Sequence, residues 1–242
     1  MPAMKGPETI QQTKHPADGQ LPGASVIWDL PTRLFHWILA LAFGTSVYTG
    51  YTGGFTQMEI HLASGQLILW LVTFRLIWGF VGHYWSRFSS FLSGPSAIKT
   101  YLRHLATGEG SQPAPGHNPL GGLSVIAMLT LLAIQAVTGL FSNDDIMTEG
   151  PLAHLISHEA SRQLTEVHAL CAALLMILVF LHLTAVFWYV FWRRHPLIRS
   201  MVTGRQTVSL PVAAPEYRLS WLRLVLALAT ATLLTYGLIN WL

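Results

Sequence analysis

The sequence is poor in charged side chains and in cysteine. Asp, Glu, Lys and Arg make up 10% of its 242 residues, whereas a soluble domain carries roughly 25%. Together with 52% hydrophobic residues, this excludes an ordinary soluble domain and predicts an integral membrane protein. The single cysteine, Cys171, excludes an internal disulfide, and the lack of a C-x-x-C-H motif excludes covalently attached c-type haem. The net charge of +3 does not predict nucleic-acid binding, because the basic residues lie at the ends of predicted helices.

Long apolar runs dominate the sequence and predict an all-α integral membrane protein. A membrane span needs about 20 apolar residues. Such runs cover residues 34–51, 60–81, 120–141, 166–194 and 219–242. Shorter helices at the membrane surface are expected near residues 95–105 and 152–164. The predicted organisation is a disordered cytoplasmic tail without a signal peptide (1–25), a four-helix domain (26–205), and a linker with a fifth C-terminal transmembrane helix (206–242).

The distribution of basic residues predicts the orientation of these spans. Of the 14 Lys and Arg residues, all except Arg75 and Arg162 fall on one side of the predicted membrane. Because cytoplasmic loops carry the excess of Lys and Arg, we expect the N-terminus in the cytoplasm and the C-terminus in the periplasm of a bacterial inner membrane. The outer loop between the third and fourth spans then carries acidic residues: Asp144, Asp145, Glu149, Glu159 and Glu166.

The fourth span contains two histidines, His168 and His182, in an otherwise apolar run. They are 14 residues apart, so both point to one face of a helix and lie roughly 21 Å apart in depth. Polar groups inside a membrane are costly and usually functional, and imidazole is a common axial ligand of haem iron. Hydrogen bonding to neighbouring helices is the alternative interpretation.

Two further histidines lie at matching depths. His36 begins the first span at the inner side, where His182 lies, and His61 begins the second span at the outer side, where His168 lies. Each of the pairs His36–His182 and His61–His168 joins two helices at one level, as a six-coordinate haem iron requires. The pattern therefore predicts two non-covalent, bis-histidine haem b groups.

Small and basic residues near these histidines are further candidates for cofactor binding. Glycines on the expected faces allow close approach of a flat macrocycle or ordinary helix packing; they are Gly50, Gly65, Gly121 and Gly139. Arg75 lies 14 residues after His61, near the inner pair, where it can meet a haem propionate or extend to the inner surface. Arg33, just before the first span, is a second candidate for the same role.

The residues that carry this pattern resemble those of the bacterial cytochrome b561 family, which includes the b-type cytochrome subunits of nickel–iron hydrogenases. The similarity rests on RLFHW (33–37), His61 with Gly65, RLIWGFVG (75–82), NPLGG (118–122), and His168 with His182. It implies a four-helix haem-binding transmembrane bundle with His36, His61, His168 and His182 as ligands. It also implies electron transfer between a quinone and a periplasmic redox partner. A fifth span departs from a plain four-helix member.

Several functions agree with these features. The leading hypothesis is an electron-transferring oxidoreductase component. Its partner is a c-type cytochrome, a hydrogenase, or a small oxidant or reductant, as in a superoxide–quinone oxidoreductase. A histidine-based proton or metal transporter and a structural anchor for a partner complex are alternatives without haem. The acidic outer loop, which leads directly to His168, is the expected docking face for a basic partner.

Overall fold

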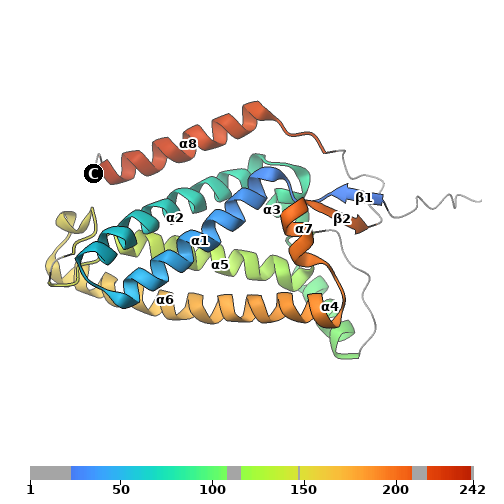
Figure 1. Cartoon of the computed structure of the whole chain (residues 1–242), viewed down its shortest axis with the longest axis horizontal. Helices are drawn as coiled ribbons and strands as arrows, with labels where there is room; N and C mark the ends of the chain where they lie inside the picture. Colours follow the sequence, from blue (N-terminus) through green and yellow to red (C-terminus); the bar gives the residue numbers. More distant parts are fainter. Residues whose placement is uncertain (1–22, 108–115, 147, 209–216, 241–242) are drawn as a thin grey trace, which may run out of the picture.

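The fold is a bundle of long antiparallel helices with short elements gathered at one end (Figure 1). The computed structural model describes residues 23–107, 116–146, 148–208 and 217–240. Its long helices are α1 (Leu30–Thr52), α2 (Phe55–Val81), α5 (Pro119–Leu140), α6 (His158–Phe187) and α8 (Trp221–Asn240). Within the described residues, four helices are long and apolar enough to cross a membrane: α2, α5, α6 with its continuation, and α8. The predicted multi-pass helical membrane protein is confirmed at this level.

Three of the long helices, α1, α5 and α6, begin where a polar side chain satisfies one of their first backbone N–H groups. The Asp29 carboxylate accepts a hydrogen bond from the Thr32 amide at the start of α1, and the Asn118 side chain accepts one from the Gly121 amide at the start of α5. Ser157 does the same for Ala160 in α6. Such caps replace hydrogen bonds that the first turn of a helix lacks. At the other end of α1, Gly53 adopts a φ of 64°, which favours glycine and turns the chain back into α2.

α6 is longer than the sequence predicts. Residues 152–164 do not form a separate surface helix: the 3-10 turn η2 (Ala153–Leu155) is followed directly by α6 from His158. The fourth span therefore begins before Glu166. The Ser157 cap starts the helix, and no Pro or Gly interrupts it before the π-helix η3 (Trp188–Trp192) continues it.

The short elements lie together at the end opposite the 142–157 loop (Figure 1). They are β1 (Gly23–Val26), η1 (Tyr84–Ser86), α3 (Phe88–Phe91), α4 (Pro95–Thr107), α7 (Leu197–Thr203) and β2 (Arg205–Val208). β1 and β2 form an antiparallel pair, with Gly23 opposite Val208. The predicted disordered tail therefore ends earlier than expected, because Gly23, Ala24 and Ser25 belong to β1; residues 1–22 lie outside the described residues. The helix expected near residues 95–105 is present as α4.

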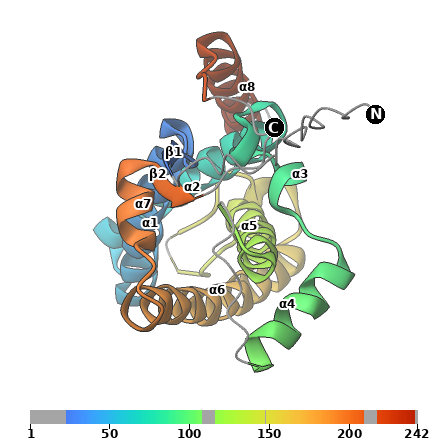
Figure 2. The same ribbon diagram turned by 90° about the vertical axis from the view of Figure 1, so that its right-hand side faces the viewer.

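Apolar packing fixes the arrangement of the long helices. The largest buried cluster joins Phe35 of α1, Leu71 and Trp78 of α2, Leu129 of α5 and Ala231 of α8. The view along the helices shows α1, α2, α5 and α6 around a common axis and α8 outside α2 (Figure 2). α8 is also held by a hydrogen bond of 3.0 Å from the Trp70 indole N–H to the Thr232 hydroxyl. The C-terminal helix is thus an addition to the four-helix bundle, attached through α2.

Candidate metal centres

The structure brings the side chains of His61 and His168 together at the end of the bundle that carries the 142–157 loop, which the sequence predicts to be the outer end. The ring centres are 6.1 Å apart and the ring planes are inclined at 77°. A metal bound between two imidazole nitrogens at about 2 Å, with each ring centre roughly 1 Å behind its nitrogen, separates the ring centres by roughly 6 Å. The observed spacing therefore suits one metal ion between the two rings, coordinated from α2 and from α6.

Hydrogen bonds from neighbouring helices orient both rings in the same way. The Nδ1 of His61 lies 2.9 Å from the Ser46 carbonyl oxygen in α1, and the Nδ1 of His168 lies 2.9 Å from the Gln135 carbonyl oxygen in α5. A carbonyl can only accept, so each Nδ1 carries the proton and each Nε2 keeps its lone pair. Ligand histidines in metal sites are usually held by such a bond from the second ring nitrogen. Each ring is thus prepared to bind a metal through Nε2.

The Gln135 side chain lies against the same ring nitrogen. Its Nε2 is 2.8 Å from the Nε2 of His168, and its Oε1 is buried without a hydrogen-bond partner among the described residues. The amide donates to the lone pair that a metal would use, so it must turn aside when the metal binds. Gln135 and Ser46 were not predicted as site residues. The signal in the sequence is weak, although Gln135 is the most polar residue of a strongly apolar span.

Two of the predicted glycines lie directly against these rings. A Cβ atom added at Gly50 would meet Cε1 of His61 at 3.0 Å, and one added at Gly139 would meet Cε1 of His168 at 2.9 Å. Both distances are too short for ordinary packing. The absence of a side chain at Gly50 and Gly139 therefore lets α1 and α5 approach the two histidines closely. These contacts with the histidine rings agree with the helix-packing alternative, and contact with a macrocycle stays a prediction.

The two remaining predicted glycines have different surroundings. A Cβ at Gly65, one turn after His61 on α2, would meet no atom within 4 Å, so this side of the helix is open. A Cβ at Gly121 would meet the Asn118 side chain at 3.3 Å and the His117 ring at 3.7 Å. Gly121 therefore lies at the inner end, close to the second group of histidines.

At the inner end, His36, His182 and Arg75 form a second group, joined by His117. Burial lowers the pKa of His117 to about 3, and repulsion by Arg75, His182 and His36 acts in the same direction. His117 lies between the rings of Trp28 and Phe91, each centred 4.7 Å from its own. Sequence reasoning treated His117 as an ordinary loop residue. Its position just before the capped start of α5 brings it into the bundle.

Several polar atoms of this inner group are buried without a hydrogen-bond partner among the described residues. They are Nδ1 of His36, Nη1 of Arg75 and Nδ1 of His117. The Arg75 side chain is 3% exposed and lies over the Phe88 ring at 5.0 Å, so it does not extend to the inner surface. Buried polar atoms almost always have partners, and these three therefore indicate a polar or charged ligand.

Arg33 has a partner of its own. Its Nη1 donates to the Val202 carbonyl oxygen at 2.5 Å, which joins α1 to α7, while its Nε is buried without a partner in the described part of the chain. Arg33 therefore joins α1 to α7, and Arg75 is the better placed cation for the inner group.

The chain is similar in sequence to b-type cytochrome subunits. A "Probable Ni/Fe-hydrogenase B-type cytochrome subunit" of Rhizobium leguminosarum bv. viciae is 31% identical over 137 residues, which are 47% of this chain and 57% of the relative. A protein of the same description from Rhodobacter capsulatus is 23% identical over 211 residues, or 75% of this chain and 80% of the relative. The chain thus covers little more than half of the first relative. No solved structure matches significantly.

The match to a family model is broader. The model of prokaryotic cytochrome b561 matches residues 27–204, which include both histidine groups and end before α8. Because this match covers well over half of the chain, the protein belongs to the prokaryotic cytochrome b561 family of membrane b-type cytochromes.

Proposed function

We propose that the chain is a dihaem b-type cytochrome that transfers electrons between the quinone pool and a periplasmic redox partner. The observation that carries the proposal is the His61–His168 pair. Its ring centres are 6.1 Å apart, and both Nδ1 atoms donate to backbone carbonyls. This arrangement supports an axial pair for one haem iron, because it leaves both Nε2 lone pairs available.

The inner group supports a second haem. His36 and His182 come from α1 and α6, and the unpaired nitrogens of Arg75 and His117 lie beside them. In this proposal His36 and His182 would hold the iron of the second haem. The guanidinium of Arg75 and the neutral imidazole of His117 would donate to its propionates, whose oxygens are strong acceptors for charged and neutral N–H groups. Gly65 leaves open space on α2 beside His61, and Gly121 allows the His117 ring to approach α5.

The chain would place the two sites at opposite sides of the membrane. When bound, b-type haem supplies an iron centre that takes up and releases one electron. His168 and His182 lie in one continuous helix, so the two ligand levels are roughly 21 Å apart within a hydrocarbon core of about 30 Å. Burial of the histidines among apolar helices and the charge of Arg75 would set the two potentials.

We further propose that α1 crosses the membrane, which makes five spans. α1 has 23 residues and a length of roughly 34 Å, and it packs along α2. Its Leu41 and Tyr48 are 74% and 67% exposed, as expected for a surface that faces lipid. Between Trp37 and Tyr51 it carries no charged side chain. The Thr49 hydroxyl donates to the Thr45 carbonyl oxygen at 2.8 Å, and the Ser46 hydroxyl lies 3.3 Å from Nδ1 of His61. With the positive-inside rule, the N-terminus is cytoplasmic, the C-terminus is periplasmic, and the membrane is the bacterial inner membrane.

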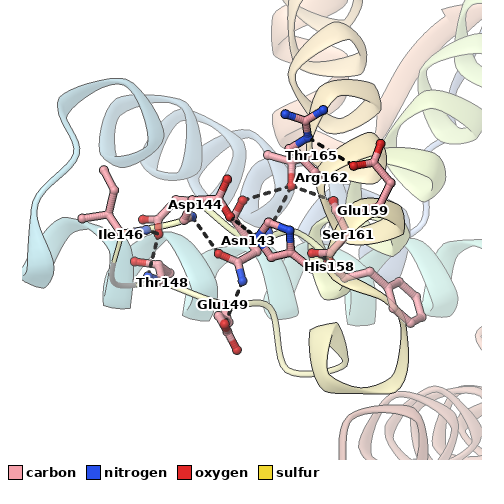
Figure 3. Close-up of polar contacts among 12 residues, drawn as sticks. Asn143, Asp144, Ile146, Thr148, Glu149, His158, Glu159, Ser161, Arg162 and Thr165 are labelled. Atoms are coloured by element: carbon pink, nitrogen blue, oxygen red, sulfur yellow. Dashed lines mark hydrogen bonds and ion pairs between the residues drawn. The ribbon is translucent and has the colours of Figure 1, made fainter.

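The outer loop is the proposed docking face for the partner. It is held to α6 by hydrogen bonds of 3.0 Å from the Asn143 amide to the Thr165 hydroxyl and of 2.6 Å from the Ser161 hydroxyl to the Phe141 carbonyl (Figure 3). The acidic side chains project from this ordered loop, next to the helix that carries His168. A fixed acidic surface beside an electron-transfer site steers basic partners by long-range attraction.

The identity of the partner is part of the proposal. The descriptions of the relatives favour a hydrogenase, and a c-type cytochrome has the same requirement for an outer docking face. A small oxidant or reductant, as in a superoxide–quinone oxidoreductase, needs access to the outer site but no large surface.

The test is to measure the haem content and the absorption spectrum of the purified protein. A pyridine haemochrome assay is expected to give two b haems per chain. His61→Ala and His168→Ala should remove one spectral component, and His36→Ala and His182→Ala should remove the other. His154→Ala is the matched control, because His154 is exposed at the outer end and belongs to neither pair.

Three outcomes would count against the proposal. If the purified protein contained no haem after expression with excess haem, a histidine-based transporter or a structural anchor would be favoured. One haem per chain would refute the dihaem assignment. Loss of the same component in His36→Ala and His168→Ala would refute the pairing.

A further inference from the structure

A basic pocket lies outside both histidine groups, between the inner ends of α2 and α8. It has a volume of about 180 Å³, far more than the roughly 15 Å³ that one water requires. Its lining includes His83, Arg87, Arg218 and Arg223, with Trp78 and Leu219 on the apolar side. None of the described residues that line it carries a carboxylate. The pocket is therefore large enough for a phosphate group and has the positive charge to bind one.

Two of the three arginines in the pocket lining form no ion pair with a described residue. These two are Arg87 and Arg223. The ion pairs His158–Asp145 and Arg162–Glu159 lie at the other end of the bundle. Arg87 donates through Nε to the Gly82 carbonyl oxygen at 2.9 Å, which fixes the guanidinium and leaves its terminal nitrogens for a ligand.

His83 provides an independent sign of a missing partner. Both of its ring nitrogens are buried, and neither has a hydrogen-bond partner within the described part of the chain. Its ring contacts Tyr217, just before α8, with ring centres 4.9 Å apart. Burial lowers the pKa of His83, and Arg87 acts in the same direction while Asp29 opposes it. A neutral His83 still has one N–H to donate to an acceptor in the pocket.

The surroundings of the pocket match a lipid headgroup in position and polarity. Phe80 and Trp221, at the ends of the two helices, are 72% and 67% exposed. Exposed aromatic residues at helix ends are typical of the membrane interface, where phosphate groups lie. Basic pockets between helices at the cytoplasmic side of a membrane bind anionic lipid headgroups. Because Arg218, Leu219, Ser220 and Arg223 follow residue 204, four of the ten lining residues lie outside the segment that matches the family.

We propose that the pocket between α2 and α8 binds the phosphate of an anionic glycerophospholipid in the cytoplasmic leaflet. Arg87, Arg223 and His83 would donate to the phosphate oxygens, and the acyl chains would follow the apolar surface beside Phe80. The bound lipid joins the added helix α8 to the bundle.

The test compares lipid binding by three forms of the haem-loaded full chain. Purified, delipidated protein is titrated with phosphatidylglycerol in detergent, and the dissociation constant is measured by native mass spectrometry. The variant Arg87→Gln with Arg223→Gln is expected to bind roughly thirty-fold more weakly, because each arginine contributes about a five-fold factor to the affinity for an anionic headgroup. The control Arg103→Gln with Arg199→Gln removes the same charge from exposed positions on α4 and α7 and is expected to bind like the unchanged protein.

Further arms distinguish the source of the phosphate and guard against misfolding. Phosphatidylcholine and inorganic phosphate should bind far more weakly than phosphatidylglycerol. Because Arg87 also caps the end of α2, the single variant Arg223→Gln is tested as well, and an unchanged haem spectrum shows that each variant is folded. Equal lipid binding by the double variant and the unchanged protein would overturn the proposal. So would an equal loss in the control, or binding of inorganic phosphate as tight as that of the lipid. None of these results depends on the number of haems.

Discussion

Adding one methyl group at Gly139 should selectively weaken the outer haem site. A Cβ at this position would lie 2.9 Å from Cε1 and 3.2 Å from Nδ1 of His168. Ordinary contacts of this kind begin at 3.4 Å, so the ring must move by 3.4 − 2.9 = 0.5 Å. A ligand bond tolerates a change of about 0.2 Å. The displacement in Gly139→Ala therefore exceeds what the metal bond permits.

The movement also strains the bond that orients the ring. The Nδ1 of His168 donates to the Gln135 carbonyl oxygen at 2.9 Å, from the same helix that carries Gly139. Loss of such an orienting bond typically costs 10–100-fold in metal affinity, which corresponds to about 1.4–2.8 kcal/mol. We expect the outer haem of Gly139→Ala to bind weaker by this factor, with the inner haem unchanged.

The measurement is the haem content and redox titration of purified variants, with each component followed in the reduced spectrum. Gly44→Ala is the matched control, because Gly44 is exposed on α1 and a Cβ there would meet no atom within 4 Å. Gly50→Ala should act like Gly139→Ala, through the 3.0 Å approach to Cε1 of His61. If Gly139→Ala retained both components with unchanged potentials and affinity, the rings would not be ligands held by these contacts.

Three further perturbations test other parts of the proposal. Arg75→Leu should lower the midpoint potential of the inner haem, because a buried cation stabilises the less positive, reduced iron centre; unchanged potentials, as expected for exposed Arg103→Leu, would exclude a role for Arg75. Neutralising the outer loop should slow association with a basic partner at low salt and flatten its salt dependence in stopped flow, whereas equal rates at every ionic strength would exclude this docking face; the changes are Asp144→Asn, Asp145→Asn and Glu149→Gln. Thr232→Val should remove the hydrogen bond from Trp70 and lower the stability of α8 packing by about 1 kcal/mol, measured as faster hydrogen exchange in α8; unchanged exchange would show that apolar contacts alone hold the helix.

The outer loop is more ordered than an acidic sequence suggests. The Asp145 carboxylate lies 2.7 Å from Nε2 of His158, and the side-chain amide of Asn143 donates to the Glu149 carboxylate at 2.7 Å (Figure 3). Oδ1 of Asp144 accepts from the amides of Ile146 and Thr148. These bonds give the loop a fixed shape, so its charges keep a fixed position relative to the outer histidines.

The sequence by itself predicted the membrane class, most of the long helices and two levels of histidines. These properties depend on local composition and on the helical repeat, which places residues 14 apart on one face at two depths. The caps at Asp29, Asn118 and Ser157 are also local and set the starts of α1, α5 and α6, although the start of α6 was not predicted.

Tertiary structure alone decided which backbone atoms and side chains surround the histidines. The carbonyls of Ser46 and Gln135, the ring contact of Gly139 and the entry of His117 into the inner group all depend on how different helices pack. The pairing of β1 with β2 and the pocket between α2 and α8 join segments that are far apart in the chain. A helical repeat fixes the direction of a side chain on its own helix, but the neighbour that it meets is set by the packing of the whole bundle.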